Sequence, residues 1–168
     1  MLCLILGLAL TGCGFQLRGA SSVPEAVQPL AFQCATPVPD VLCRAVKTQL
    51  SLADASTADA SDAKTVLKLS DFREDRRANA VTAQAAAAEY TLRQSIGVEV
   101  LSANGTPLLA TERVTSAETY RYDETNVLAK EQEEDTLQNE LAERLAQQVL
   151  FLLAPLNQTR MDSLEAEQ

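Results

Sequence analysis

The sequence predicts an α+β domain whose elements follow the order strand, helix, three strands, helix. Three observations lead to this prediction. Apolar and polar residues alternate over residues 66–71 and again over residues 90–100, which is the pattern of half-buried strands. The pair Asn104-Gly105 comes after the second run and is a strong hairpin signal. From residue 137 to residue 152 the apolar residues instead recur at helical spacing.

The first strand and the first helix are expected between residues 30 and 52. The short apolar run 30–32 lies between prolines, which favours one strand flanked by irregular chain. After Pro39-Asp40, a pair that can begin a helix, six residues recur on one helical face until the helix ends near Leu52: Val41, Leu42, Ala45, Val46, Gln49 and Leu50. The small polar residues from there to residue 64 have no periodicity and are expected to form a surface loop.

The three later strands are expected to begin with residues 66–71. We interpret the charged run 73–77 as a solvated strand face or a strand extension rather than a binding site. The four alanines at 85–88 are interpreted as a turn or a strand end that leads into the long strand 90–100. The Asn-Gly turn then connects this strand to a returning strand at 108–122.

The last helix is expected after Asp123, where the period changes to 3.6. Acidic residues between 131 and 135 fall in its opening turns, where negative charge complements the helix N-terminus. One apolar stripe typical of a core face runs up to Pro155: Leu137, Leu141, Leu145, Val149 and Leu152. Residues 156–168 are mostly polar, and we expect a disordered tail there.

Residues 1–12 are apolar, carry no charge, and are interpreted as a signal peptide. As a helix they would reach about 18 Å, too short for a hydrocarbon core of about 30 Å. No Lys or Arg precedes the apolar run, and the simplest explanation is that Met1 is a misplaced start.

The stretch Leu10-Thr11-Gly12-Cys13 resembles the lipobox of bacterial lipoproteins, and the alternative is a chance Gly-Cys pair after an apolar run. The resemblance implies that the Cys13 thiol receives a diacylglyceryl group, that cleavage occurs before Cys13, and that the new amine is acylated. Three acyl chains would hold the mature chain permanently to a bilayer. Gly14 comes next, and the absence of Asp at that position implies the outer membrane rather than the inner one.

Two further cysteines, Cys34 and Cys43, remain in the expected mature domain. An exported chain meets an oxidising compartment, which favours a disulfide between them over two separately buried thiols, although both arrangements stay open. Closing a loop of about ten residues would contribute roughly 2.5 kcal/mol in the chain-entropy model.

Charge and composition argue against several classes of function. The formal net charge of −9 disfavours nucleic acid as a partner, because phosphate neutralisation needs a basic face. The chain has no histidine, which removes Ser-His-Asp and Cys-His catalysis and the commonest metal ligand. An enzyme that uses carboxylates such as Glu99 and Glu112 is the weakest hypothesis, because alternating acids on strands usually mark a wet face. We expect no cofactor apart from the covalent lipid on Cys13.

Three stretches together resemble the LptE family of lipopolysaccharide-assembly outer-membrane lipoproteins: GCGFQLRG around Cys13, AEYTL at 88–92, and YRYDETNVLAKEQEED at 120–135. The likeness covers residues 13–155. It implies a two-layer sandwich, a four-stranded mixed sheet with two helices on one face. It further implies a lipid-anchored plug, facing the periplasm and the lumen of an LptD-type β-barrel, that helps lipopolysaccharide reach the outer leaflet. The alternative is a free-standing periplasmic ligand-binding lipoprotein with a deep apolar pocket.

Two segments are candidates for contact with such a barrel. Residues 15–18, with Phe15 and Arg18, lie just after the anchor and are expected near the membrane. The end of the returning strand offers amphipathic rings and a charge in Tyr120, Arg121 and Tyr122. For the two tyrosines, capping the sheet edge against the last helix is an equal alternative.

Overall fold

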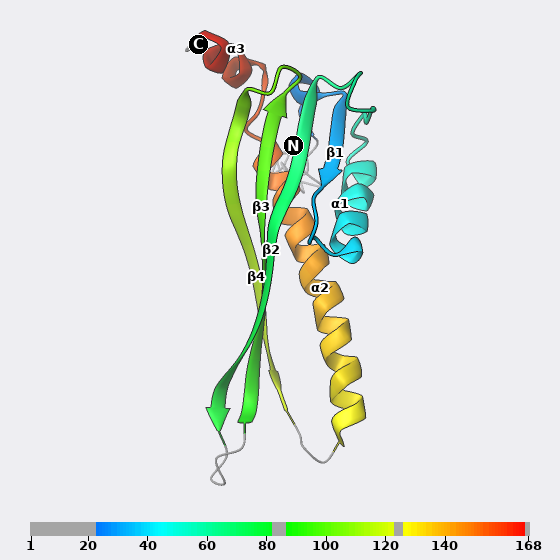
Figure 1. Ribbon diagram of the computed structural model, residues 1–168, viewed down its shortest axis with the longest axis vertical. Helices are drawn as coiled ribbons and strands as arrows, with labels where there is room; N and C mark the ends of the chain where they lie inside the picture. The colour runs from blue at the N-terminus through cyan, green and yellow to red at the C-terminus, as the bar shows by residue number, and fades with distance from the viewer. Residues whose placement is uncertain (1–22, 82–86, 123–125, 167–168) are drawn as a thin grey trace, which may run out of the picture.

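The computed structural model describes residues 23–81, 87–122 and 126–166. Four strands form one mixed sheet in the order β1-β2-β3-β4. Strand β1 (Leu30–Cys34) pairs in parallel with β2 (Thr65–Val81), and β3 (Ala87–Ser102) and β4 (Pro107–Arg121) come next as antiparallel neighbours. Helices α1 (Asp40–Leu52) and α2 (Val127–Leu153) pack on one face of this sheet, as Figure 1 shows. The predicted two-layer α+β sandwich is confirmed.

Each main helix forms where its apolar spacing predicts. The carbonyl of Pro39 accepts the backbone N–H groups of Leu42 and Cys43, so α1 begins at the predicted Pro39-Asp40 pair. Buried leucines on α2 recur at helical spacing and face the sheet, among them Leu141 and Leu145. The predicted Asn-Gly hairpin is present, and Gly105 adopts a φ of 85° that suits glycine.

The main hydrophobic core lies in what we call the proximal half: β1, α1, the adjoining parts of β2 to β4 and the C-terminal part of α2. Its buried side chains come from every one of these elements: Leu30, Leu42, Val46, Leu50, Leu67, Leu69, Ile96, Val98, Leu108, Leu145 and Leu153. Cys34 at the end of β1 and Cys43 in α1 form a disulfide, with Cα atoms 6.2 Å apart. The predicted disulfide is therefore present.

Beyond the proximal half, β2 to β4 and the first half of α2 continue alone as the distal half (Figure 1). Strand β2 passes through a bulge at Asp71, which has a φ of 51°, and then pairs with β3 again from Arg73. The charged run 73–77 is thus a strand extension, which is one of the two interpretations that its sequence allows. Ala87 and Ala88 begin β3, whereas residues 85 and 86 lie outside the described part.

The expectation of a disordered tail over residues 156–168 is wrong for most of that range. Helix α3 (Gln158–Ala166) comes after α2, and the Asn157 side chain accepts the backbone N–H of Arg160 in its first turn. Leu156 and Met161 are buried and belong to the proximal core. Leu156 and Met161 pack this short segment against the core. They lie in a mostly polar stretch, so the sequence pattern did not indicate a packed helix.

Within the described residues, no helix combines the length and the apolar character needed to cross a bilayer.

Candidate interaction surface

The side of the sheet opposite α1 and α2 carries a polar surface in the distal half. Buried Leu92 and Ile96 show that the even positions of this part of β3 point toward the helices, so its odd positions point outward. The register across β2, β3 and β4 then defines the outward side chains, which we call the open face: Arg73, Asp75, Arg77, Glu89, Thr91, Arg93, Ser95, Arg113, Thr115, Ala117, Thr119 and Arg121.

These side chains stand in rows across the three strands. Arg77 aligns with Thr91 and Thr119, and the two threonine Oγ1 atoms lie 2.8 Å apart. Asp75, Arg93 and Ala117 form the neighbouring row. Ala117 is the single apolar member of the open face. The surface consists mainly of guanidinium groups and hydroxyls with two carboxylates, Asp75 and Glu89, and has almost no area that would favour burial in an apolar environment.

The bulge residue Asp71 fixes the end of the open face nearest the proximal core. Arg73 donates to both of its carboxylate oxygens, at 3.2 and 3.0 Å. Arg113 also pairs with this carboxylate and donates to the Asp71 carbonyl and to Ser95 Oγ, each at 3.2 Å. Hydrogen bonding from Arg73, together with the charges of both arginines, lowers the pKa of Asp71 below its ordinary value. Asp71 therefore stays ionised and holds two arginines in place.

The open face is basic although the chain as a whole has a formal net charge of −9. Arg77 pairs with Asp75 at 2.9 Å, and Arg121 pairs with Glu89 at 3.5 Å. Arg93 makes no ion pair among the described residues. These are exposed pairs, which water screens and which a partner can replace.

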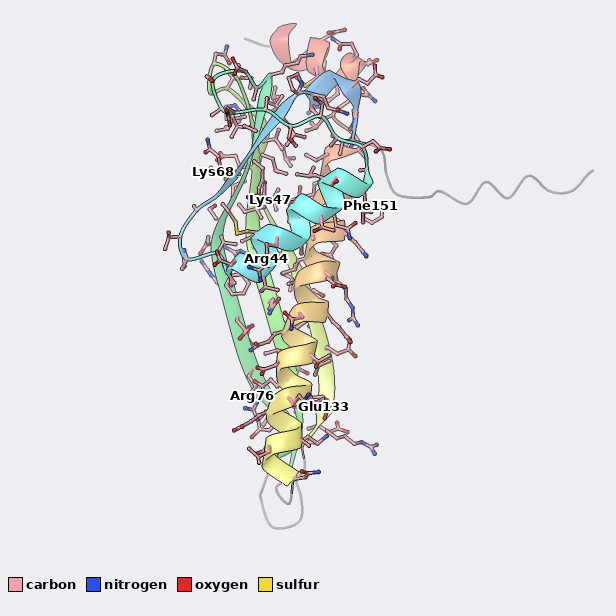
Figure 2. The ribbon with its side chains drawn as sticks, turned by 90° about the vertical axis from the view of Figure 1, so that its right-hand side faces the viewer. Arg44, Lys47, Lys68, Arg76, Glu133 and Phe151 are labelled. Atoms are coloured by element: carbon pink, nitrogen blue, oxygen red, sulfur yellow. A yellow bond between two sulfur atoms is a disulfide. The ribbon has the colours of Figure 1, made fainter. Side chains whose placement is uncertain are left out.

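On the helix side of the distal half, aromatic rings surround one arginine. The Arg76 guanidinium carbon lies 3.8 Å from the ring centroid of Tyr90 and 5.5 Å from that of Tyr122. Its Nη1 pairs with Glu134 of α2 at 3.3 Å, and the Tyr120 hydroxyl donates to the same carboxylate at 2.6 Å. We call these five residues the clasp, because they bind the first half of α2 to the sheet. Figure 2 shows Arg76 beside α2 in the distal half.

The clasp bears on the two interpretations of Tyr120 and Tyr122, which are contact with a barrel partner and capping of the sheet edge against the last helix. Tyr120 is only 5% exposed and packs with Leu92 and Leu141, which favours the capping alternative over contact with a partner. Burial, and then the hydrogen bond to Glu134, raise the pKa of Tyr120. Tyr122 is half-buried in the same cluster.

Arg121 remains available to a partner, because its side chain is 88% exposed on the open face. Cys13, Phe15 and Arg18 lie outside the described residues. Arg93 and Arg113 were not predicted as contact residues, although both stand at alternate positions of predicted strands. Continuing the alternation onto the outward positions would have found them.

The groove between α1 and α2 is not the deep apolar pocket expected of a free-standing ligand-binding lipoprotein. It has a volume of about 480 Å³ and a mixed lining: Val41, Arg44, Ala45, Thr48, Gln49, Asn139 and Glu143. Glu99, one of the two candidate catalytic acids, pairs with Lys68 at 3.7 Å on the sheet surface. In the described part of the chain no group of three or more side chains could hold a metal ion.

Comparison with known proteins bears on the fold and the family. The chain is 32% identical over 161 residues to the LPS-assembly lipoprotein LptE of Pectobacterium atrosepticum, covering 92% of this chain and 85% of that protein. The structure is similar to rare lipoprotein B from Shewanella oneidensis (TM-score 0.65, 21% identity, 83% of this chain and 98% of the other). It is also similar to a minor lipoprotein from Acinetobacter baumannii (TM-score 0.63, 22% identity, 75% and 90%).

Both solved structures share the mixed four-stranded sheet with two main helices, and at these identities they support the fold alone. The family is shown by a model described as "LptE: Lipopolysaccharide-assembly", which matches residues 26–153. This range covers the sheet, both main helices, the open face and the clasp. The chain belongs to the LptE family of non-enzymatic lipopolysaccharide-assembly lipoproteins.

Proposed function

We propose that this protein is an outer-membrane lipoprotein that plugs and helps assemble an LptD-type β-barrel and assists lipopolysaccharide transport to the outer leaflet. Family membership supports a role in lipopolysaccharide assembly. The proposed contact with a barrel is supported by the open face. This is a wide polar sheet surface in a domain whose apolar core lies on the other side of the sheet, under the helices.

The length of the three long strands, which run through both halves, fits this role. Strands β2, β3 and β4 contain 17, 16 and 15 residues. At about 3.3 Å per residue such strands extend for roughly 50 Å, and typical strands contain about 3–10 residues. A sheet of this length exceeds the thickness of the hydrocarbon core, about 30 Å. The lumen of a large outer-membrane barrel is polar, so a plug inside it needs wet, charged surfaces along its length.

The open face also offers positive charge to the anionic lipid that is transported. An acidic protein repels an anionic glycolipid over distances of about 10 Å at moderate salt, so any contact needs a local basic group. Arg73, Arg93 and Arg113 supply such groups on one surface. The proposed anchor is Cys13 with its covalent acyl and diacylglyceryl groups, which would keep the domain at the outer membrane.

Co-purification tests this proposal. The mature chain with a C-terminal tag is extracted from outer membranes in mild detergent, and the proteins that elute with it are identified by mass spectrometry. We expect one large β-barrel as the main partner. A Cys13→Ser variant is the control, and we expect an unlipidated precursor that recovers little barrel.

Depletion of the protein gives a second measurement. We expect a misassembled barrel, less surface lipopolysaccharide and greater permeability to large hydrophobic antibiotics. A chain that elutes alone, together with unchanged surface lipopolysaccharide after depletion, would contradict the proposal and favour the free-standing ligand-binding lipoprotein.

A further inference from the structure

Strand β4 ends the sheet, and its outer edge has no partner in the described part of the chain. From Arg113 to Arg121 its register with β3 is unbroken, running from the Gly97–Arg113 pair to the Glu89–Arg121 pair. Nine residues at about 3.4 Å each give an unbroken edge of roughly 30 Å. Such an edge presents a row of unpaired backbone N–H and C=O groups that can bind another strand.

The other open edge of the same sheet is protected. Strand β1 pairs with β2 only as far as Leu69, so the outer edge of β2 is open beyond that point. There the register shifts between Ser70 and Arg73 and twice more between Ala78 and Val81. Bulges of this kind twist an edge and prevent another strand from pairing with it.

The first part of β4 is protected in a similar way. It begins with Pro107, and its register shifts between Val98 and Leu101 of the neighbouring strand. Residues 113–121 have no proline, no lysine and no register shift. Of the two open edges, this is the longest segment without a proline, a lysine or a register shift, which are features that prevent pairing at an exposed edge.

We infer that the β4 edge from Arg113 to Arg121 binds an extended segment of the barrel partner by β-strand addition. The inference depends on the proposed function and specifies how the two proteins make contact. Strands of a barrel wall are already paired with their neighbours on both sides. The added strand is therefore a loop of the barrel that reaches into the lumen rather than a strand of its wall.

The side chains of β4 specify the chemistry of that loop. On the open-face side the edge has Arg113 and Arg121 at its ends, with Thr115, Ala117 and Thr119 between them. Directly opposed cross-strand pairs of opposite charge are favourable, and so are Thr–Thr or Thr–Ser pairs. The matching segment has a carboxylate near each end and small or hydroxylated residues in the middle. Backbone hydrogen bonds would supply affinity, and these side-chain pairs would supply specificity.

Amide hydrogen exchange within the purified complex tests the inference. The complex is exchanged in D₂O, quenched and dissociated, and the amides of this chain are then read individually by NMR. In the free protein every second amide of 113–121 points away from β3 and exchanges quickly. We expect those amides to become protected at least about tenfold in the complex, while the outer-edge amides of β2 beyond Leu69 keep their rates.

Two matched lysine substitutions provide an independent measurement. Ala117 and Asn79 are both exposed residues on the open-face side of strands with an open edge, since the Asn79 side chain donates to Thr91 of the open face. We expect Ala117→Lys to reduce barrel recovery about tenfold, because an edge lysine opposes strand addition. Asn79→Lys, on the bulged edge of β2, should leave recovery within about twofold of the unmodified chain.

Each outcome has a defined meaning. A stable complex in which the alternate β4 amides exchange as quickly as in the free protein would overturn the inference and leave the barrel-plug proposal intact. Protection of the same amides in the purified chain alone, at a mass of two copies, would also overturn it, because the edge would then bind itself. Failure to recover any barrel would refute the proposed function and the inference together.

Discussion

The two halves of this domain are held together by different kinds of contact. The proximal half has a continuous apolar core contributed by β1 to β4, α1 and α2, and a disulfide ties β1 to α1. The distal half has a small hydrophobic cluster of Leu92, Tyr120 and Leu141, and depends on the clasp around Arg76 to bind α2. Stability is thus concentrated in one half, and the exposed polar surface in the other.

A polar layer separates the two regions. Gln94 is only 3% exposed and lies on β3 between Leu92 and Ile96. Its Nε2 donates to Glu74 at 2.8 Å and to the Gln138 carbonyl at 3.3 Å. Because polar contacts interrupt the apolar core at this point, we expect the distal half to open without exposing the proximal core.

The largest loss of stability is expected in the proximal core. Leu145→Ala leaves a cavity there and should lower the free energy of unfolding by about 4 kcal/mol. Leu92→Ala makes the same truncation in the distal cluster and should lower it by about 2 kcal/mol, because half-buried tyrosines can move into the space. Urea unfolding measures both. Equal losses would show that the two halves are equally well packed.

Removing the disulfide tests the second support of the proximal half. Replacing Cys34 and Cys43 by serine should lower the free energy of unfolding by about 2–3 kcal/mol, because the unfolded chain regains the freedom of the closed loop. Reduction of the unmodified protein is the control and should give a similar loss. Labelling of both free thiols in protein prepared without reductant would contradict the disulfide itself.

The clasp is expected to have a smaller effect that is confined to the distal half. Tyr120→Phe removes a hydrogen bond to the Glu134 carboxylate while Arg76 still pairs with it, and should cost about 1–2 kcal/mol. Tyr90→Phe keeps the ring against Arg76 and should cost less than about 0.5 kcal/mol. Hydrogen exchange should accelerate in the first half of α2 for Tyr120→Phe. Uniform acceleration across the domain would mean that the distal half does not open separately.

The smallest effect on stability concerns Asp71 and pH. The pKa of Asp71 is lower in the folded protein than its ordinary value of 3.8, so its contribution to stability is present above that value. It is lost as pH falls through the folded pKa. Asp71→Asn should therefore reduce the drop in melting temperature between pH 5 and pH 2, measured by circular dichroism. Asp59→Asn, in the loop after α1, is the control and should leave the drop unchanged.

Sequence patterns predicted those helices and turns that depend on residues close together in the sequence. The spacing of Leu141, Leu145 and Val149 predicted α2, and Asn104-Gly105 predicted the hairpin, because each depends on neighbouring residues. Helix α3 was missed because its only described apolar anchors, Leu156 and Met161, depend on contacts far away in the sequence.

The outward face of β2 could not be predicted by alternation alone. Before the bulge at Asp71 the odd positions Leu67 and Leu69 point inward, whereas after it the even positions Glu74 and Arg76 do. One extra residue in a strand moves every later side chain to the other face. A strict alternation therefore places Arg76 on the wrong side. Likewise, the burial of Tyr120 depends on where α2 crosses the sheet, which no local pattern encodes.

The family and the non-catalytic character were predicted correctly from short stretches and from the absence of histidine. The residues of the open face were predicted only in part, because Arg121 was among the predicted contact residues whereas Arg77, Arg93 and Arg113 were not. Only the paired register of three strands brings Arg77, Arg93 and Arg113 onto one face.

Crosslinking from both layers of the domain in living cells tests most directly whether a barrel surrounds this protein. A photoreactive amino acid is placed at Arg93 on the open face or at exposed Gln147 on α2, and the adducts are identified by mass spectrometry. We expect both positions to capture the same outer-membrane barrel, because a lumen encloses both layers. Capture of that barrel from Gln147 but not from Arg93, or of no barrel from either position, would contradict a surrounding barrel.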